Sequence, residues 1–101
     1  MSTHTVYIYP GAWKEIKNLR GHMRHRVKQT IDALAKNPRP SNSIALETPN
    51  FSREARRLRL DRWRIVYVVT EDEFEQAIDV LTVRKRPPYD YEDLEELLAQ
   101  V

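Results

Sequence analysis

Arginine is the residue type through which this sequence could do chemistry. Six arginines fall between residues 53 and 64, where only Glu54 and Asp61 oppose them. A guanidinium is planar and permanently charged, and it binds phosphate oxygens through two parallel hydrogen bonds. The segment is therefore a candidate phosphate-binding site. The alternative is a solvated charged surface that forms salt bridges with the acidic residues at 71–75.

A β-hairpin would bring three of these arginines onto one surface. Residues 57–60 alternate arginine and leucine, and residues 63–69 are apolar apart from Arg64. Between these two runs lie Asp61 and Arg62, which we expect at the hairpin tip. This tip places Arg59 opposite Arg64, and the alternation of side chains puts Arg57 on the same side. Like charges directly opposite each other destabilise a sheet, so the pairing favours an anion bound between them. The other side would face the core with Leu58, Leu60, Trp63 and Ile65.

The segment after the last expected strand could add further groups to this surface. The alternation of side chains puts Arg84 and Arg86 together, and we expect Arg86 to converge with the hairpin arginines. Tyr89 and Tyr91 follow a Pro-Pro pair, and aromatic rings among arginines are typical of single-stranded RNA binding. The alternative for each tyrosine is a ring packed on the edge of the sheet.

Other chemistries have little support in the sequence. His22 and His25 could share a metal ion on a helix, but no nearby carboxylate completes a ligand set. The chain contains no cysteine, which excludes thiolate zinc sites, and its two glycines form no phosphate-binding loop. We therefore predict neither a metal nor another cofactor.

The order of helix and strand patterns along the sequence predicts one α+β domain spanning residues 1–101. Its elements must position the residues described above. The expected architecture is an N-terminal strand and a helical hairpin packed on a mainly antiparallel four-stranded sheet, with a short C-terminal helix and with the helices on one face. Gly21 is the expected end of the first helix, and the proline- and serine-rich segment 38–52 is expected to be mostly loop. The predicted elements are a strand at 3–9, a helix that begins at Pro10 and stops at Gly21, a helix from Met23 to near Asn37, strands at 57–60, 63–69 and 78–83, and a helix at 91–101.

The charge is distributed unevenly along the chain. Residues 1–70 hold 14 lysines and arginines against 5 acidic residues, whereas residues 71–101 hold 3 against 10. Such a protein can offer one surface to a polyanion and another to a basic partner. The longest apolar run, 65–69, is too short to cross a bilayer, and no signal-peptide pattern is present, so we expect a cytoplasmic protein.

Three segments resemble the RelE/ParE superfamily of type II toxins. They are Arg57-Leu-Arg-Leu, Trp63-Arg-Ile-Val-Tyr67, and Val83-Arg-Lys-Arg86 with the tyrosines that follow. The resemblance extends over nearly the whole chain and implies a toxin that is neutralised by a cognate antitoxin. RelE-like members cut messenger RNA in the ribosomal A site without a metal. The 2′-hydroxyl of the RNA attacks the adjacent phosphate and leaves a 2′,3′-cyclic phosphate.

The resemblance also implies roles for single residues. Arg64 matches the family arginine that stabilises the scissile phosphate, and Arg86 matches a second arginine that acts there. Tyr89 or Tyr91 would stack on a base or assist proton transfer. The residues expected to bind RNA phosphates are Arg57, Arg59, Arg84 and Lys85.

Two positions depart from the family pattern. Arg57 and Arg59 stand where RelE-like toxins often have lysines. An arginine keeps its proton and is a poor general base, so the group that accepts the proton stays open. This departure favours one alternative, a weakly active homologue that binds RNA or antitoxin. A second alternative is a ParE-like inhibitor of DNA gyrase, in which the same fold binds a protein target and cuts nothing. The sequence predicts neither the codon preference nor the oligomeric state.

Overall fold

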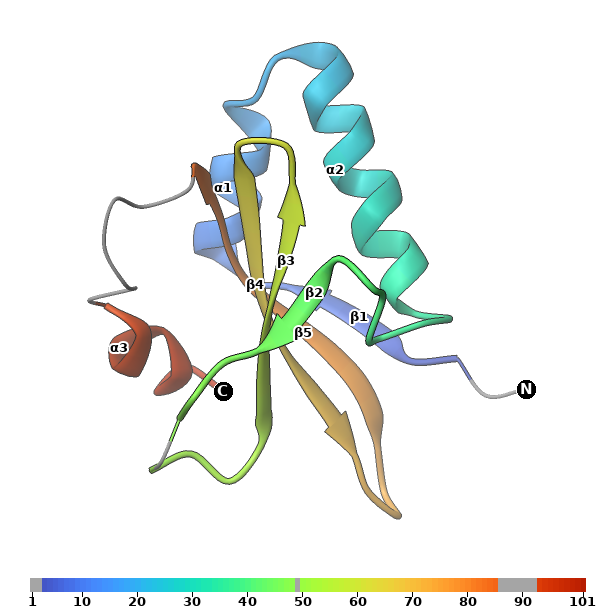
Figure 1. Cartoon of the computed structure of the whole chain (residues 1–101), viewed down its shortest axis with the longest axis vertical. Helices are drawn as coiled ribbons and strands as arrows, with labels where there is room; N and C mark the ends of the chain where they lie inside the picture. Colours follow the sequence, from blue (N-terminus) through green and yellow to red (C-terminus); the bar gives the residue numbers. More distant parts are fainter. Residues whose placement is uncertain (1–2, 49, 86–92) are drawn as a thin grey trace.

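The computed structural model describes residues 3–48, 50–85 and 93–101 of the chain. Its strands form one sheet in the order β1-β5-β4-β3-β2, in which β1 runs parallel to β5 and all other neighbours are antiparallel (Figure 1). This architecture confirms the predicted α+β class. The strands are β1 (Thr5–Ile8), β2 (Ser43–Ala45), β3 (Glu54–Leu60), β4 (Trp63–Glu71) and β5 (Gln76–Lys85). The helices are α1 (Pro10–Lys17), α2 (Gly21–Leu34) and α3 (Leu94–Leu98).

Helices α1 and α2 cover one face of the sheet and enclose the main hydrophobic core. Pro10 is the first residue of α1, a position that needs no backbone N–H donor. The prediction that Gly21 ends this helix is wrong, because α1 ends at Lys17 and Gly21 begins α2. Gly21 does not have the positive φ of a glycine that terminates a helix. The buried core consists of Ala12, Ile16, Leu19, Val27, Ile31, Leu34, Leu58, Ile65, Tyr67, Val69, Ile78, Val80 and Val83.

Helix α3 covers the opposite face, so the expectation that all helices share one face is wrong for this element. Leu97 and Leu98 of α3 pack with Ala55, Val68 and Leu81 in a second apolar cluster. All seven residues of β4 between its two ends are buried, which requires cover on both faces of the sheet. Within the described residues the helix spans five residues rather than the predicted 91–101.

The sheet has one strand more than the four that were predicted. The additional strand, β2, lies within the segment 38–52 that we expected to be mostly loop. It is three residues long and pairs with Arg56, Arg57 and Leu58 of β3. A strand this short shows no periodic pattern in the sequence, so its neighbour β3 rather than its own composition places it in the sheet.

The hairpin formed by β3 and β4 has the predicted register. Arg59 pairs with Arg64, Leu60 pairs with Trp63, and the turn lies between them. Asp61 in this turn has a φ of 54°, in the left-handed region that aspartate tolerates better than most residues. The sequence therefore predicted correctly which side chains of the hairpin face the core.

A bulge in β5 sets the direction of the side chains that follow it. Two consecutive residues of β4 pair with Val80 and Thr82, which leaves Leu81 without a partner in the ladder. One extra residue shifts the alternation of side chains by one position. The bulge therefore brings Arg84 to the same side of the sheet as Arg64, its partner on β4.

Candidate phosphate-binding site

Three arginines occupy neighbouring positions on three adjacent strands. Arg64 of β4 pairs with Arg59 of β3 on one side and with Arg84 of β5 on the other. Directly opposed side chains lie within about 5 Å of each other at their Cβ atoms, and like charges there are destabilising. The structure accommodates the three charges in three different ways.

Arg84 is held by a carboxylate of the same chain. Its Nη1 and Nη2 atoms donate to the two carboxylate oxygens of Asp93, each at 3.0 Å, and its Nε donates to Thr82 Oγ1 at 3.1 Å. The guanidinium of Arg84 lowers the pKa of Asp93 below its usual value. Because Asp93 immediately precedes α3, this ion pair fastens α3 to the sheet.

Arg64 is buried, with only 5% of its surface exposed. Its Nη1 donates to the backbone carbonyls of Asp61 and Trp63, both at 2.9 Å. Both acceptors belong to the hairpin tip, so the guanidinium is fixed against the turn that carries it. A cation held in this way needs little reorganisation when an anion binds beside it.

Arg59 is exposed, and its backbone rather than its side chain is fixed. The Asn42 Nδ2 atom donates to the Arg59 carbonyl at 3.0 Å, and the Arg59 N–H donates to the Asn42 carbonyl at 2.9 Å. Within the part of the chain that the structure describes, neither Arg59 nor Arg57 forms an ion pair with a carboxylate. The side chain of Arg59 is therefore available to an external anion.

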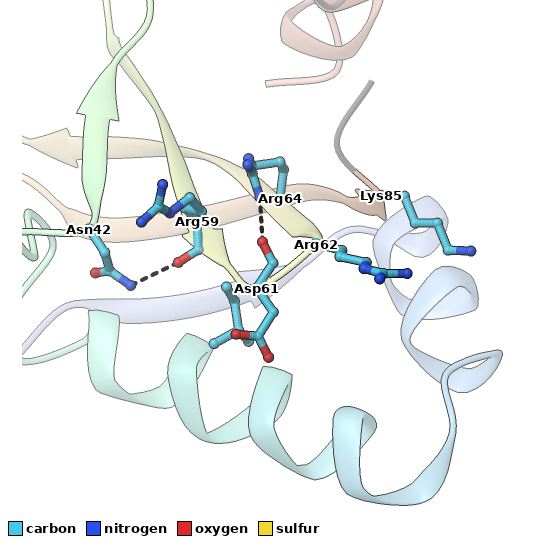
Figure 2. Close-up of a pocket in the computed structure, with 7 residues that line it drawn as sticks. Asn42, Arg59, Asp61, Arg62, Arg64 and Lys85 are labelled. Carbon is cyan, nitrogen blue, oxygen red and sulfur yellow. Dashed lines mark hydrogen bonds between the residues drawn. The ribbon is translucent and has the colours of Figure 1, made fainter. Parts of the chain in front are cut away.

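A hollow of about 710 Å³ opens around the hairpin tip. We call it the cationic hollow, because four of its seven lining residues are basic and one is acidic (Figure 2). The acidic residue, Asp61, is bound at 2.5 Å by Arg26 of α2, which offsets its charge. The hollow is lined by Asn42, Arg59, Leu60, Asp61, Arg62, Arg64 and Lys85.

Lys85 and Arg62 extend to the same side of the hollow (Figure 2). Lys85 pairs with Trp63 on β4, and its Nζ lies 6.0 Å from the centroid of the Trp63 ring. A cation over an aromatic face is favourable and limits the freedom of the lysine. Arg62 forms no ion pair among the described residues.

The structure thus brings three predicted site residues, Arg59, Arg64 and Lys85, around one hollow. Arg57 is half-buried on β3 outside the lining, and Arg84 is engaged with Asp93. The predicted site residues Arg86, Tyr89 and Tyr91 lie outside the described residues.

Four of the seven lining residues of the cationic hollow were not predicted as site residues, and two of these, Arg62 and Asn42, carry groups that can donate a hydrogen bond to an anion. Arg62 belongs to the arginine-rich segment. Its position at the hairpin tip could have identified it as a site residue, because side chains in the turn do not follow the alternation between the two faces of the strands. Asn42 lies in the preceding loop, and no pattern in the sequence links it to Arg59.

A second group of arginines lies in a network of carboxylates that we call the acid-paired cluster. Arg39 binds Glu54 at 2.7 Å and Glu71 at 2.6 Å, and Arg56 binds Glu54 at 2.8 Å. The adjacent Arg39 holds the pKa values of both glutamates below their usual range. His4 adds a hydrogen bond of 2.8 Å to Glu71. The cluster joins the residue before β1, the segment after α2, and strands β3 and β4.

The described residues contain neither a cluster of metal ligands nor a helix that could span a membrane. No group of three or more His, Asp or Glu side chains among them converges as a metal site would require, and this includes His22 and His25. None of the described helices has the length and apolar character needed to span a bilayer.

The sequence matches a known family of toxins over most of its length. The profile of the family described as "ParE toxin of type II toxin-antitoxin system, parDE" matches residues 6–87. A comparison with curated protein sequences gives no significant match.

Solved structures with a similar fold come from archaea and bacteria. RelE in the archaeal RelE-RelB complex of Pyrococcus horikoshii has 24% identity and a TM-score of 0.72, covering 86% of this chain and 99% of its own. The isolated RelE toxin of E. coli has 19% identity and a TM-score of 0.65, covering 96% of this chain and 97% of its own. The YoeB/ParE toxin of Agrobacterium tumefaciens has 17% identity and a TM-score of 0.62, covering 82% of this chain and 99% of its own.

Proposed function

The chain belongs to the RelE/ParE superfamily of type II toxins, and we propose from this premise that it is a ribosome-dependent endoribonuclease of the RelE type. The observation that carries the proposal is the cationic hollow, in which Arg59, Arg62, Arg64 and Lys85 surround a space of about 710 Å³. A concentration of cations in a solvent-accessible hollow suits a polyanion such as messenger RNA.

The proposed reaction uses the RNA itself as the nucleophile. The 2′-oxygen of one nucleotide forms a bond to the adjacent phosphorus while the bond from phosphorus to the 5′-oxygen breaks. One proton leaves the 2′-hydroxyl and one reaches the 5′-oxygen, so that the products are a 2′,3′-cyclic phosphate and a 5′-hydroxyl. No atom of the protein forms a covalent bond in this reaction.

We assign the stabilisation of the transition state to Arg64. The phosphorus centre gains negative charge as it becomes five-coordinate, and guanidiniums that are already oriented stabilise that charge more than they stabilise the bound substrate. The two backbone carbonyls that hold Arg64 supply this orientation. Arg59, exposed beside it, would bind the phosphate or its neighbour along the strand.

Proton transfer is assigned to the segment after β5. Arg57 and Arg59 keep their protons at neutral pH and cannot accept one from the 2′-hydroxyl. We therefore assign proton transfer or base stacking to Tyr89 or Tyr91, and a second phosphate contact to Arg86, as the family resemblance implies. The Arg86→Ala variant described below tests the phosphate contact.

The proposed partner of the toxin is a cognate antitoxin. The structure from Pyrococcus horikoshii is described as a complex of RelE with RelB, which supports an antitoxin for the present chain as well. An antitoxin segment that enters the cationic hollow would neutralise the toxin by excluding RNA. Because translation takes place in the cytoplasm, we place both proteins there.

The second candidate function is ParE-like inhibition of DNA gyrase. It is favoured by the match of the ParE toxin profile to residues 6–87. In this alternative the chain binds a protein target and cuts no RNA. The two candidates share the fold, so only an activity measurement separates them.

The test combines two assays on the same purified protein. Primer extension on a translated message should show cleavage within codons, while supercoiling by gyrase should continue undisturbed. Arg64→Ala should slow cleavage by about 100-fold or more, as the loss of an oriented transition-state donor does, and Arg86→Ala should act in the same direction. Inhibited supercoiling without cleavage would establish the second candidate instead.

Two further variants separate a role in the site from a role in folding. Arg64 is buried, so its removal also tests stability, whereas Arg59→Ala removes an exposed side chain and should leave the thermal midpoint unchanged. Arg20→Ala is the matched control, since Arg20 is an exposed arginine that does not line the hollow. Full cleavage by Arg59→Ala, Arg64→Ala and Arg86→Ala alike would overturn the assignment of the site.

A further inference from the structure

The turn between β4 and β5 carries a phenylalanine that the fold leaves in solvent. Phe74 is 88% exposed, more than any other exposed large apolar side chain of the described residues. Single exposed apolar residues are common, but this side chain occupies the tip of a hairpin, where nothing nearby could cover it. Such a position suits a contact with another molecule.

The turn is held in one conformation by its own residues. The Asp72 carboxylate accepts hydrogen bonds from the backbone N–H groups of Phe74 and Glu75, each at 2.8 Å, and the Asp72 N–H donates to the Glu75 carbonyl at 3.0 Å. Asp72 is thereby used within the turn. A fixed turn loses little conformational entropy when it binds, so Phe74 is already oriented before a partner arrives.

Carboxylates flank the phenylalanine on both sides. Glu73 and Glu75 are exposed and form no ion pair within the described parts of the chain, whereas Glu71 at the base of the hairpin is bound by Arg39. The tip therefore offers one aromatic ring between two unpaired negative charges. A surface that carries cations would complement these charges, whereas the phosphates of RNA would be repelled by them.

The same chain carries a surface with the complementary chemistry. The cationic hollow presents Arg59, Arg62 and Lys85 without carboxylate partners among the described residues. Guanidiniums bind carboxylates and also lie favourably on the face of an aromatic ring. The β3–β4 turn, whose residues line the hollow, and the β4–β5 turn lie at opposite ends of β4, so one copy cannot bring its own two surfaces together (Figure 1).

We propose that the β4–β5 tip of one copy, with Phe74 between Glu73 and Glu75, docks into the cationic hollow of a second copy. β4 begins at the hollow and ends at the tip. Two copies with antiparallel β4 strands can therefore make the contact twice and close a symmetric dimer. The contact itself does not depend on the proposed nuclease activity. Its consequence does, because a dimer of this kind occludes the hollow and keeps RNA out.

The test is sedimentation of the purified full chain over a range of concentrations at two ionic strengths. At about 10 mM salt, where charges act over about 30 Å, the average mass should rise with concentration. At about 1 M salt, where the range is about 3 Å, the dimer should dissociate. Phe74→Ser should raise the dissociation constant at least tenfold, whereas Tyr7→Ser, which removes an exposed aromatic ring of β1, should leave it unchanged.

Mixing two defective variants makes the test specific to this contact. The Phe74→Ser variant keeps the hollow, and an Arg59→Ala, Arg62→Ala double variant keeps the tip. Each alone should be monomeric, and an equimolar mixture should regain association through the one contact that remains. A wild-type chain that stays monomeric at low salt, or a mixture that gains no mass, overturns the proposal. Because sedimentation contains no RNA, it is independent of the cleavage assay.

Discussion

The acid-paired cluster and the cationic hollow use the same side chain in opposite ways. In the cluster, Arg39 and Arg56 bind Glu54 and Glu71, so the charges cancel and separate segments of the chain are joined. In the hollow, Arg59 lies beside a second arginine across the hairpin and has no carboxylate partner among the described residues. Arginines that pair with carboxylates join segments of the fold, whereas Arg59 in the hollow keeps a charge that no described carboxylate offsets.

The two regions also differ in their effect on the stability of the fold. Pairing Arg59 with Arg64 across two strands costs stability, and a fold under no other demand would place a neutral or acidic residue at one of the two positions. The acid-paired cluster has no such cost. Three experiments test whether the two regions divide stability and binding between them, and a fourth measures the cost of a buried carboxyl outside both regions.

The largest effect should appear in RNA binding. Replacing Arg59 and Arg62 together with alanine should weaken binding of a single-stranded RNA about 10- to 100-fold. It should also reduce the salt slope of the binding constant by about 0.7 for each phosphate that is no longer neutralised. Replacing Arg39 and Arg56 removes the same formal charge from the other region and should change the binding far less. Equal weakening in the two double variants would show that net charge rather than the hollow binds RNA.

A smaller effect should appear in stability. Here a substitution in the acid-paired cluster should matter, and a substitution in the cationic hollow should not. Arg39→Met keeps the aliphatic stem but leaves Glu54 and Glu71 without their shared partner. We expect a decrease of about 1 kcal/mol in the free energy of unfolding, discounted for partial exposure, and a drop of about 4–8 °C in the thermal midpoint. Arg59→Met is the matched variant and should not lower the midpoint. If it lowers the midpoint as much as Arg39→Met does, the division between the regions is absent.

Acid titration should sharpen this result. Arg39 lowers the pKa of Glu54 and of Glu71 in the folded protein, so the stabilisation is complete above their unfolded pKa of about 4.3 and disappears as the pH falls through the lower folded values. Urea unfolding at neutral pH and near pH 3 measures this change. The Arg39→Met variant should show a weaker dependence on pH, and an unchanged dependence would remove Arg39 as its cause.

The smallest effect is an increase in stability, and it is expected from a substitution of Asp79. Burial raises the pKa of Asp79 above its usual value, and the nearby Glu75 adds to the shift. A folded pKa above the unfolded value means that stability falls as the pH rises through this range, so ionised Asp79 is a cost at neutral pH. Asp79→Asn should therefore raise the free energy of unfolding by a few tenths of a kcal/mol at pH 7. Near pH 3, where the native carboxyl is protonated, the variant should match the wild type.

The predictable part of the site followed from local rules. The turn position fixes which residues oppose each other, and side chains alternate along a strand, so the register of Arg59 and Arg64 and the inward direction of Leu58 and Ile65 could be predicted. The same alternation explains why Tyr67 is buried in the core and why Trp63 packs against it while partly exposed.

The parts that could not be predicted depend on contacts between distant residues. Asp93 comes to Arg84 because α3 returns to the sheet, and Asn42 comes to Arg59 because β2 adds to its edge. The side that α3 covers is decided by apolar side chains on both faces of β4, and an alternating pattern cannot show this. The bulge at Leu81 likewise follows from the pairing of β5 with β4. The sequence of β5 alone does not indicate where this bulge lies.

The sequence by itself determined the α+β class, the register of the arginine hairpin, the buried side of that hairpin and the resemblance to the toxin family. These features rest on the spacing of neighbouring residues, which the chain carries in any conformation. Only the tertiary structure decided which of the described arginines form ion pairs with carboxylates of the same chain and which do not. Ion pairs join residues far apart in the chain, as Arg39 and Glu71 do, and such distances are set by the folding of the sheet.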